Sequence, residues 1–539
     1  MNGRISRRKF LKGVGLGVGT AAASIAAPKL ASAAAPRQAG AEVTYWTPIA
    51  GNPAATLKSY ADITCYKEME KVTNVKIIFQ HVPDNPQAQE AFNLLVASGK
   101  YPDVIEFNWL NNYAGGPARA VKDGLIQRLN PYLDAGKLPH FAKVLADHPD
   151  WKRMIQTDEG DIYCFPFLRG DPGLQTFAGP WVRADHLEKA GIKNTPKTID
   201  DWTAMFKGLK GKDLNGNGKA DEYPMTTWLF GRGTDAISYS GAFAGAFGTT
   251  LGYYNEGGKV KYGPIEPEFK EFMALLVSWG QQGFIHPDTF TMTQAQWDTQ
   301  ILNGNISSGV MLVGGGIGRM TTLARGTQPK FKLQGVQYPS LKAGGRSAFG
   351  QYENVYPGGG TAAITTACRN IDAALKVLDF PYSPEGHMLF NFGKLGAQYD
   401  MVGGFPKWRP EIVKPPKLPL AQSIAQHARS NFSGPFVQDI RYLQQYFAFP
   451  EQKAAYELWS KEDHTRVMPP VTPTQAESRR FGRIMTEVTT RVNTAFAKVA
   501  TGALPISGWD TLVAEIKSIG IDEAIGIQQA AIERFYSRK

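Results

Sequence analysis

Strand-like and helix-like stretches alternate at short intervals near the start of this chain. A strand pattern over 42–46 and a β-branched strand over Val75–Phe79 flank one predicted helix. A second predicted helix, Gln87–Ser98, has apolar residues on one face, and a strand-like segment over 99–107 follows it. Parallel strands need a crossover connection, which is usually a helix. The alternation therefore predicts an α/β lobe built on a largely parallel sheet.

More than one lobe is expected from the length of the chain. Its 539 residues exceed what a single hydrophobic core usually serves. Thr198 to Asp201 fit a capping box, and the helix that they open places Trp202 on its apolar stripe, so we expect this side chain in the core. Trp279 lies on a similar stripe. The segment 508–539 predicts two helices separated at Gly520.

The first 36 residues have the pattern of an export signal. Ser6 to Lys12 match the twin-arginine pattern, a Gly/Ala-rich apolar stretch follows, and Ala31 to Ala33 supply small residues for cleavage. We therefore predict a twin-arginine signal peptide over 1–36 and a protein that is soluble outside the cytoplasm. A chance basic arm is the alternative. The first cysteine is Cys65, so the sequence does not support a lipid-modified cysteine at the cleavage site.

The positive charge of the chain is concentrated in that signal segment. The formal net charge is +11, and residues 1–36 contain six Arg or Lys residues and no acid. Subtracting these six leaves +5 for the remainder. A nucleic-acid partner therefore loses most of its support, and we expect none.

An oxygen-rich stretch before Pro224 has the composition of a loop that holds a hard cation. Oxygen-bearing residues recur at alternate positions with Gly218 at the bend, which suits Ca²⁺. The spacing matches the first half of an EF-hand, but Pro224 stands where the closing Glu would be. An Asn/Gly-rich surface turn is the alternative, although it does not require three carboxylates. The predicted ligands are the side chains of Asp213, Asn215, Asn217, Asp221 and Glu222 and the backbone carbonyl of Lys219.

Six segments, in order along about 440 residues, resemble one family. The family is the extracellular solute-binding proteins of ABC importers, in particular the oligosaccharide-binding subgroup that includes the alginate-binding proteins. The segments are Ser98–Ile105, Asp161–Pro166, Trp181–Gly191, Asp213–Pro224, Asn370–Tyr399 and Trp509–Phe535. At 391–396 the chain reads Asn-Phe-Gly-Lys-Leu-Gly, which departs from the family pattern and introduces Lys394.

The resemblance implies an α/β, two-lobed periplasmic-binding-protein fold with hinged lobes, central mixed or parallel sheets and extra C-terminal helices. The first lobe would comprise 41–166 and 328–385; the second would comprise 167–327 and 386–539 and carry the calcium loop. The resemblance also implies a structural Ca²⁺ ion, an oligosaccharide bound between the lobes, and delivery to ABC permease subunits at the membrane surface. We expect a periplasmic or extracellular monomer.

Sugar recognition needs flat apolar faces for the ring and polar groups for the hydroxyls. Loop-flanked aromatic residues could supply the faces, although core packing explains any single one of them equally well. Loop-flanked cations could bind a carboxylate, although solvated or ion-paired roles are more common. A neutral oligosaccharide is the default and an acidic sugar stays open. The candidates are Trp46, Trp109, Trp228, Tyr352 and Trp408, with Arg169, Arg232 and Lys394.

The alternative function is a secreted, calcium-stabilised enzyme that acts on polysaccharides. A glycosidase needs two carboxylates close together in a cleft, and no motif pairs Asp171, Asp235 or Glu353. The glycine-rich run 314–318 lacks the Lys-Ser/Thr of a phosphate loop, so we expect a crossing between lobes or a turn there. A calcium-dependent adhesion module fits poorly with the α/β alternation. The sequence favours binding without catalysis.

Overall fold

The structure is a computed structural model that describes residues 41–539 except 85–86, 114, 227–241, 416–417 and 539. Residues 41–539 form one compact unit. The predicted signal peptide lies outside the described residues. In the part of the chain that is described, no helix combines the length and the apolar character needed to cross a membrane.

The first sheet has four strands in the order β10-β3-β1-β2. β1 (Ala41–Ile49) pairs in parallel with β2 (Val75–Pro83) and with β3 (Val104–Phe107), as the alternating pattern predicts. β10 (Thr361–Ile364) joins the edge of β3 antiparallel, from a distant part of the sequence. The sheet is therefore mixed, and its outer strand is one that the local pattern could not place.

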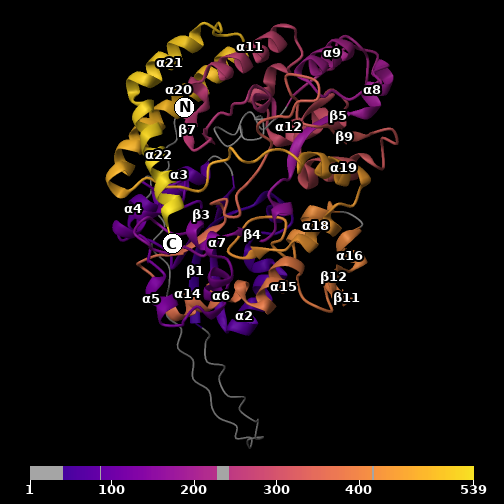
Figure 1. Cartoon of the computed structure of the whole chain (residues 1–539). Helices are drawn as coiled ribbons and strands as arrows, with labels where there is room; N and C mark the ends of the chain where they lie inside the picture. The colour runs from indigo at the N-terminus through magenta and orange to yellow at the C-terminus, as the bar shows by residue number, and fades with distance from the viewer. Residues whose placement is uncertain (1–40, 85–86, 114, 227–241, 416–417, 539) are drawn as a thin grey trace, which may run out of the picture. The chain divides into compact units, whose positions relative to one another are not determined.

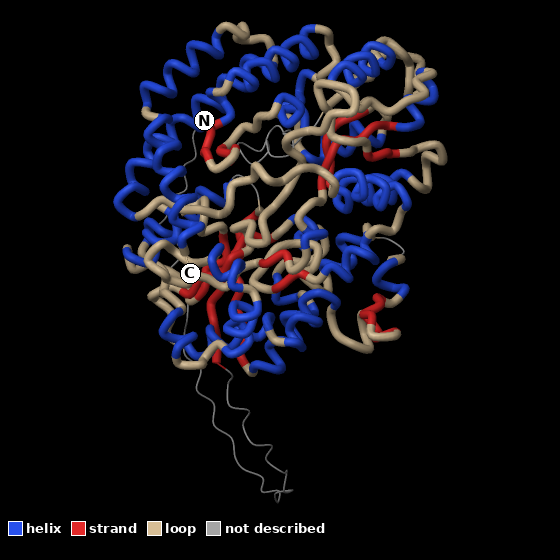
Figure 2. The backbone as a smooth tube through the Cα atoms, in the orientation of Figure 1, coloured by secondary structure: helices blue, strands red, loops and turns tan. Residues whose placement is uncertain are grey.

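Helices cover this sheet and fill the first core (Figures 1 and 2). The predicted helix over 87–98 is confirmed as α3 (Gln87–Ser98). α2 (Thr64–Thr73) ends at Asn74, whose φ of 52° is left-handed and stops the helix directly before β2. The other helices on this side are α4 (Gly116–Lys122), α5 (Asn130–Asp134), α6 (Pro139–Asp147), α7 (Pro149–Met154), α14 (Ile371–Asp379) and α15 (Pro384–Phe392).

A second, three-stranded sheet has the order β8-β5-β9. β5 (Ala178–Arg183) is buried along its whole length and pairs antiparallel with both β8 (Ser308–Leu312) and β9 (Leu333–Gly335). Gly179 allows this packing, because a Cβ there would overlap the ring of Trp459. The second core forms around this sheet.

The helices of the second core follow the predicted pattern closely. The capping box at Thr198 is confirmed, since Thr198 and Asp201 exchange side-chain-to-backbone bonds at the start of α9 (Ile199–Leu209). Trp202 and Trp279 are fully buried, as predicted. Gly520, with a φ of 115°, separates α21 (Gly508–Ile519) from α22 (Ile521–Ser537), also as predicted. The remaining helices here are α8 (Ala184–Ala190), α11 (Pro267–Gln281), α12 (Gln294–Leu302), α13 (Arg319–Ala324), α19 (Pro450–Trp459) and α20 (Gln475–Ala500).

A smaller third cluster packs around the hairpin of β11 (Tyr399–Val402) and β12 (Phe405–Trp408). It includes α16 (Pro410–Val413), α17 (Leu420–Ala425) and α18 (Ile440–Tyr446). Other short elements include α1 (Gly51–Ala54), β4 (Leu168–Arg169), β6 (Tyr253–Glu256), β7 (Lys259–Tyr262), β13 (Val437–Gln438) and the π-helical turn η7 (Val313–Gly318).

Some segments pack in a different core from the one that the predicted lobe boundaries would give them. The division into lobes stays a prediction. Residues 328–385 were assigned to the first lobe, but Leu333, Val336 and Tyr338 pack in the second core beside Trp181. Residues 386–539 were assigned to the second lobe, but Leu389, Phe390 and Phe436 pack in the first core. Long-range strand pairing, which local sequence patterns do not report, decides in which core such segments pack.

Candidate ligand-binding site

The chain passes three times between the first and second cores, and the three connecting segments meet. The chain passes between residues 168 and 181, between 338 and 356, and between 436 and 455. Arg169 on the first passage donates from Nε to Glu353 Oε2 (2.9 Å) on the second and from Nη1 to Gln438 Oε1 (3.1 Å) on the third. We call these three segments the junction. The Arg169 side chain therefore bridges all three.

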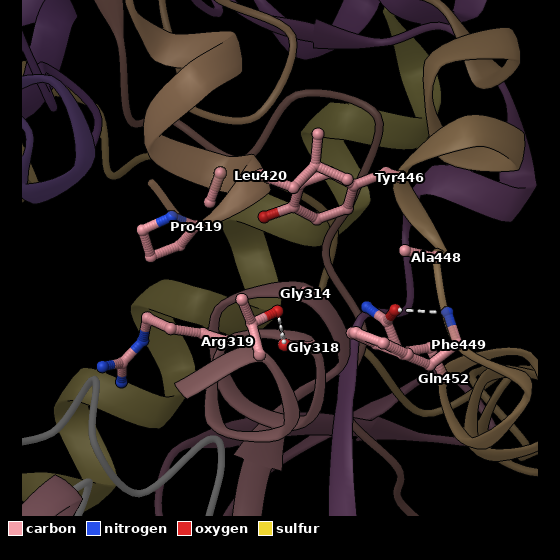
Figure 3. A pocket seen from close by; sticks show the side chains of 11 residues that line it. Gly314, Gly318, Arg319, Pro419, Leu420, Tyr446, Ala448, Phe449 and Gln452 are labelled. Atoms are coloured by element: carbon pink, nitrogen blue, oxygen red, sulfur yellow. Dashed lines mark hydrogen bonds between the residues drawn. The ribbon is translucent and has the colours of Figure 1, made fainter. Parts of the chain in front are cut away.

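A small pocket of about 20 Å³, which we call the Tyr446 pocket, lies where the second core meets the third cluster (Figure 3). Gly314, Gly318 and Arg319 of η7 and α13 form one wall. Pro419 and Leu420, at the start of α17, and Tyr446, at the end of α18, approach from the other cluster. Phe449 and Gln452 at the start of α19 complete the lining. The pocket is therefore built from segments far apart in the sequence.

The glycine run gives this pocket its shape. A Cβ at Gly314 would overlap Tyr446 Cε1, and a Cβ at Gly318 would overlap Gln452 Nε2. Glycine at these positions therefore lets a tyrosine ring and an amide approach the backbone of the turn. Of the two readings of this run, the turn is the one observed, since Val313 before it and Ile317 within it both pack in the second core.

The polar groups around the pocket are held by neighbouring protein atoms. Arg319 pairs with Asp298 through both terminal nitrogens, with Nη2 2.8 Å from Oδ1, and its Nε donates to Gly315 O (2.8 Å). Gln452 Nε2 donates to Val313 O (3.1 Å), and its Oε1 accepts from the backbone N–H of Phe449 (3.1 Å). Burial raises the pKa of Tyr446 to about 12, so its hydroxyl stays protonated. The pocket offers apolar faces beside fixed polar groups.

Three predicted aromatic ligands lie in cores. Trp46 on β1 is 5% exposed and packs edge-on against Phe107. Trp109 is fully buried, and its indole N–H donates to Ile105 O (3.2 Å). Trp408 is 3% exposed and donates to Phe392 O (3.2 Å). Their rings are occupied by core packing, so we do not carry them into the proposed site. Large aromatic side chains turn inward because that removes the most apolar area from water.

The structure brings two of the remaining candidates together. Arg169 lies at the junction with its guanidinium 4.6 Å from the Phe177 ring centroid. Tyr352, next to Glu353, stacks on His464 with 4.2 Å between ring centroids. Lys394 is exposed and pairs with Glu68 (3.1 Å). Trp228 and Arg232 lie outside the described residues.

Sequence reasoning missed Tyr446, Phe449 and Arg319. A signal was present in the aromatic run Tyr442 to Phe449, where four aromatic residues fall within eight positions. Its helical spacing read as core packing, and nothing in the sequence connects it with the glycine run more than 120 residues earlier.

The predicted calcium loop is folded around its own oxygens. Asp213 Oδ1 accepts from the N–H of Gly216 (2.7 Å) and Asn217 (3.1 Å), and Oδ2 accepts from Gly218 N (2.9 Å). The Asn217 side-chain oxygen accepts from Lys219 N (2.8 Å). These bonds curl the loop so that its oxygen-bearing side chains turn toward its own backbone.

Glu222 provides the test of whether this loop fits a cation. Its Oε1 accepts from the N–H groups of Leu214 and Asn215, both at 2.7 Å. Its Oε2 is buried and has no hydrogen-bond partner in the protein. A buried carboxylate oxygen without a partner is costly, and a cation would satisfy it. Among the described residues, no three His, Cys, Asp or Glu side chains are grouped to hold a metal, so the three carboxylates of this loop do not converge on one point in the structure.

Comparison with known proteins shows which family the chain belongs to. A sequence model described as "Bacterial extracellular solute-binding protein" matches residues 64–390, more than half of the chain. The fructooligosaccharide ABC transporter substrate-binding protein FusA of Streptococcus pneumoniae is 28% identical over 252 residues. The aligned stretch spans only 44% of the length of FusA and 44% of this chain.

Solved structures show the fold. The alginate-binding protein AlgQ2, crystallised without calcium ion, superposes with a TM-score of 0.77 at 22% identity, over 92% of this chain and 98% of that one. A FusA EF-hand mutant in complex with fructo-nystose superposes with a TM-score of 0.72 at 19% identity, over 92% of this chain and 100% of that one. The chain has the mixed α/β periplasmic-binding-protein fold. It belongs to the bacterial extracellular solute-binding proteins, a family that binds solutes rather than transforming them.

Proposed function

We propose that this protein binds an oligosaccharide outside the cytoplasm and delivers it to the permease of an ABC importer. The observation that carries the proposal is the Tyr446 pocket, which combines an aromatic ring with fixed polar groups at the meeting of two clusters. The printed names of relatives support it, since FusA is a fructooligosaccharide-binding protein and AlgQ2 an alginate-binding protein.

The lining residues suit a sugar ring, which would enter when the second core and the third cluster move apart, because the pocket as described has room for about one water molecule. The C–H face of a pyranose or furanose packs on Tyr446 and Phe449, because large amphipathic rings give contact area with few torsions to fix. Hydroxyl groups exchange hydrogen bonds with the polar atoms of Arg319 and Gln452. We keep Arg169 and Tyr352 as candidates on the junction side and Lys394, Trp228 and Arg232 as further candidates. A sugar that touches both clusters stabilises the closed arrangement by the contacts that it adds there.

We also propose a structural Ca²⁺ ion in the loop 213–222. The ligands are those that the sequence predicts: Asp213, Asn215, Asn217, Asp221, Glu222 and the Lys219 carbonyl. Support comes from the partnerless buried Oε2 of Glu222 and from the calcium and EF-hand named for AlgQ2 and FusA. When bound, the ion would supply charge neutralisation and cross-linking of the loop rather than catalysis.

Partners and location follow as part of the same proposal. The twin-arginine segment would direct folded protein across the membrane, and the ligand-loaded monomer would then dock on permease subunits at the membrane surface. No nucleic acid is involved. The two-lobe arrangement would place the junction between the moving parts.

The experiment is titration calorimetry with neutral fructo-oligosaccharides and with uronate oligosaccharides, on wild type and on Tyr446→Leu. The substitution keeps apolar volume but removes the ring, and we expect affinity to fall about tenfold or more, which corresponds to ~1.4 kcal/mol. Tyr536→Leu is the matched control, because Tyr536 is 60% exposed on α22. If both Tyr446→Leu and Tyr536→Leu lose affinity, or if neither does, the proposed binding site is contradicted. Turnover of the sugar contradicts the function.

A further inference from the structure

The charge of Arg319 is cancelled inside the wall of the Tyr446 pocket. Asp298 on α12 binds both terminal nitrogens of Arg319 in a two-pronged pair. The two side chains are only 13% and 18% exposed, so water screens the pair weakly. The third anchor, from Arg319 Nε to Gly315 O, fixes the guanidinium to the glycine turn. Asp298 and Arg319 therefore form one neutral unit of defined geometry.

Nothing else on this wall offers net charge. Of the described residues that line the pocket, Arg319 alone is ionised, and the others are glycine, apolar, hydroxyl or amide residues. The two cationic candidates at described positions elsewhere are paired in the same way, Arg169 with Glu353 and Lys394 with Glu68. A sugar carboxylate in the pocket would have to displace Asp298 from Arg319 or lie beside the like negative charge of Asp298. Both alternatives are unfavourable in a weakly screened site.

Sugar hydroxyls meet no such obstacle. A guanidinium has five N–H donors, and the Asp298 and Gly315 bonds engage three of them. A neutral hydroxyl can accept from a paired guanidinium without displacing the carboxylate. The pair thus presents donors without presenting charge.

We infer that Asp298 sets the charge specificity of this site, so that the protein takes uncharged oligosaccharides and rejects uronates. This inference rests on the proposed function. It also distinguishes between the two ligand classes named for the relatives, neutral fructo-oligosaccharide and acidic alginate.

The test compares a uronate with its neutral methyl ester and with an unrelated neutral oligosaccharide. Affinities for trigalacturonate, for its fully methyl-esterified form and for nystose are measured on wild type and on Asp298→Asn. We expect wild type to bind a neutral ligand at least tenfold more tightly than trigalacturonate. Asp298→Asn should shift the ratio of uronate to ester affinity at least tenfold toward the uronate, and added salt should weaken the gained affinity. Glu523→Gln, which removes the exposed partner of Arg480, is the matched charge control and should leave the ratio unchanged.

The outcomes separate the inference from the function. Wild type binding trigalacturonate more tightly than its ester overturns the inference while the function stands, as does an Asp298→Asn ratio that matches wild type. Binding of no oligosaccharide removes the proposed function and the inference with it. If Asp298→Asn fails to fold, Arg319→Gln decides instead, because it leaves Asp298 unpaired and should reject the uronate still more strongly. A gain of uronate affinity in Arg319→Gln overturns the inference.

Discussion

Glu106 on β3 and Arg429, 323 residues later, form a buried two-pronged ion pair in the first core. Oε1 lies 2.8 Å from Nη2 and Oε2 lies 3.1 Å from Nη1, and the side chains are 3% and 1% exposed. The Tyr45 hydroxyl donates to Glu106 Oε2 (2.7 Å), and the guanidinium lies 4.7 Å from the Tyr60 ring centroid. The pair fastens a late segment of the chain to the first sheet.

Removing one charge of this pair should destabilise the protein strongly. Glu106→Gln leaves Arg429 charged and buried without its counter-ion, so we expect a loss of about 3–5 kcal/mol in the free energy of unfolding. Urea denaturation measures the change. Asp372→Asn is the control, because its pair with Lys137 is exposed and its loss should change the free energy of unfolding little. Equal effects of the two substitutions would show that the buried pair contributes no more to stability than the exposed pair.

Calcium removal should lower thermal stability through the loop 213–222. If free Ca²⁺ is about 100 times its Kd, binding adds roughly 2.7 kcal/mol to the free energy of unfolding. EGTA should therefore lower Tm in wild type and leave Tm unchanged in Asp213→Ala and Glu222→Gln. Glu188→Gln on α8 is exposed and outside the loop, so it should keep the wild-type response. A wild-type Tm that does not change on addition of EGTA would contradict the proposed calcium site.

The close approach of Tyr446 to the glycine turn should make position 314 intolerant of a methyl group. Gly314→Ala forces the ring away and should cost about 1–3 kcal/mol of stability together with sugar affinity. Gly326→Ala is the matched control, since a Cβ there meets nothing within 4 Å. Chemical denaturation and calorimetry on both variants check this. Unchanged sugar affinity in Gly314→Ala would remove Tyr446 from the proposed site.

Glu462 should make stability depend on pH. Burial raises the pKa of Glu462 to about 7, above its usual value near 4.5, although Arg346 opposes the shift. The native state then holds this proton more tightly than the unfolded state does, so Glu462 lowers the free energy of unfolding as pH rises from about 4.5 to about 7. Glu462→Gln removes this loss, and its Tm should exceed that of wild type at pH 8 but not at pH 4.5.

The comparison between the two proteins isolates Glu462 from its neighbour. Burial lowers the pKa of His464, which changes stability in the opposite direction over nearby pH values, but this contribution is common to wild type and variant. Thermal melts across the range give the difference directly. A Tm difference that stays constant with pH would contradict the raised pKa.

Local signals in the sequence predicted local structure well. The helix at Gln87–Ser98, the capping box at Thr198 and the break at Gly520 each depend on residues within one or two turns, and all three are confirmed. The parallel pairing of β1 with β2 follows from a short helical crossover in the same way. Family resemblance added the overall fold, which local patterns alone leave open.

The site was less accessible from sequence because its parts are distant along the chain. Arg169 and Glu353 are 184 residues apart, and Gly314 meets Tyr446 across 132 positions. Trp109 and Trp408 looked like loop aromatics, but tertiary packing buries them, and no spacing rule reports that. The exposed loop residue Lys394 looked like a free cation, but it pairs with Glu68 on α2, which is more than 300 positions earlier in the sequence.

The late arrival of β10 has a consequence for biosynthesis. β3 stays an unpaired sheet edge until residues 361–364 emerge from the ribosome, and the first core lacks Phe436 until later still. At about 5–20 residues per second, translation reaches that point only after roughly 20–90 s. Through that interval the nascent chain exposes apolar strand edges that invite aggregation. The first core can therefore be completed only late in translation, once residues 361–436 have emerged.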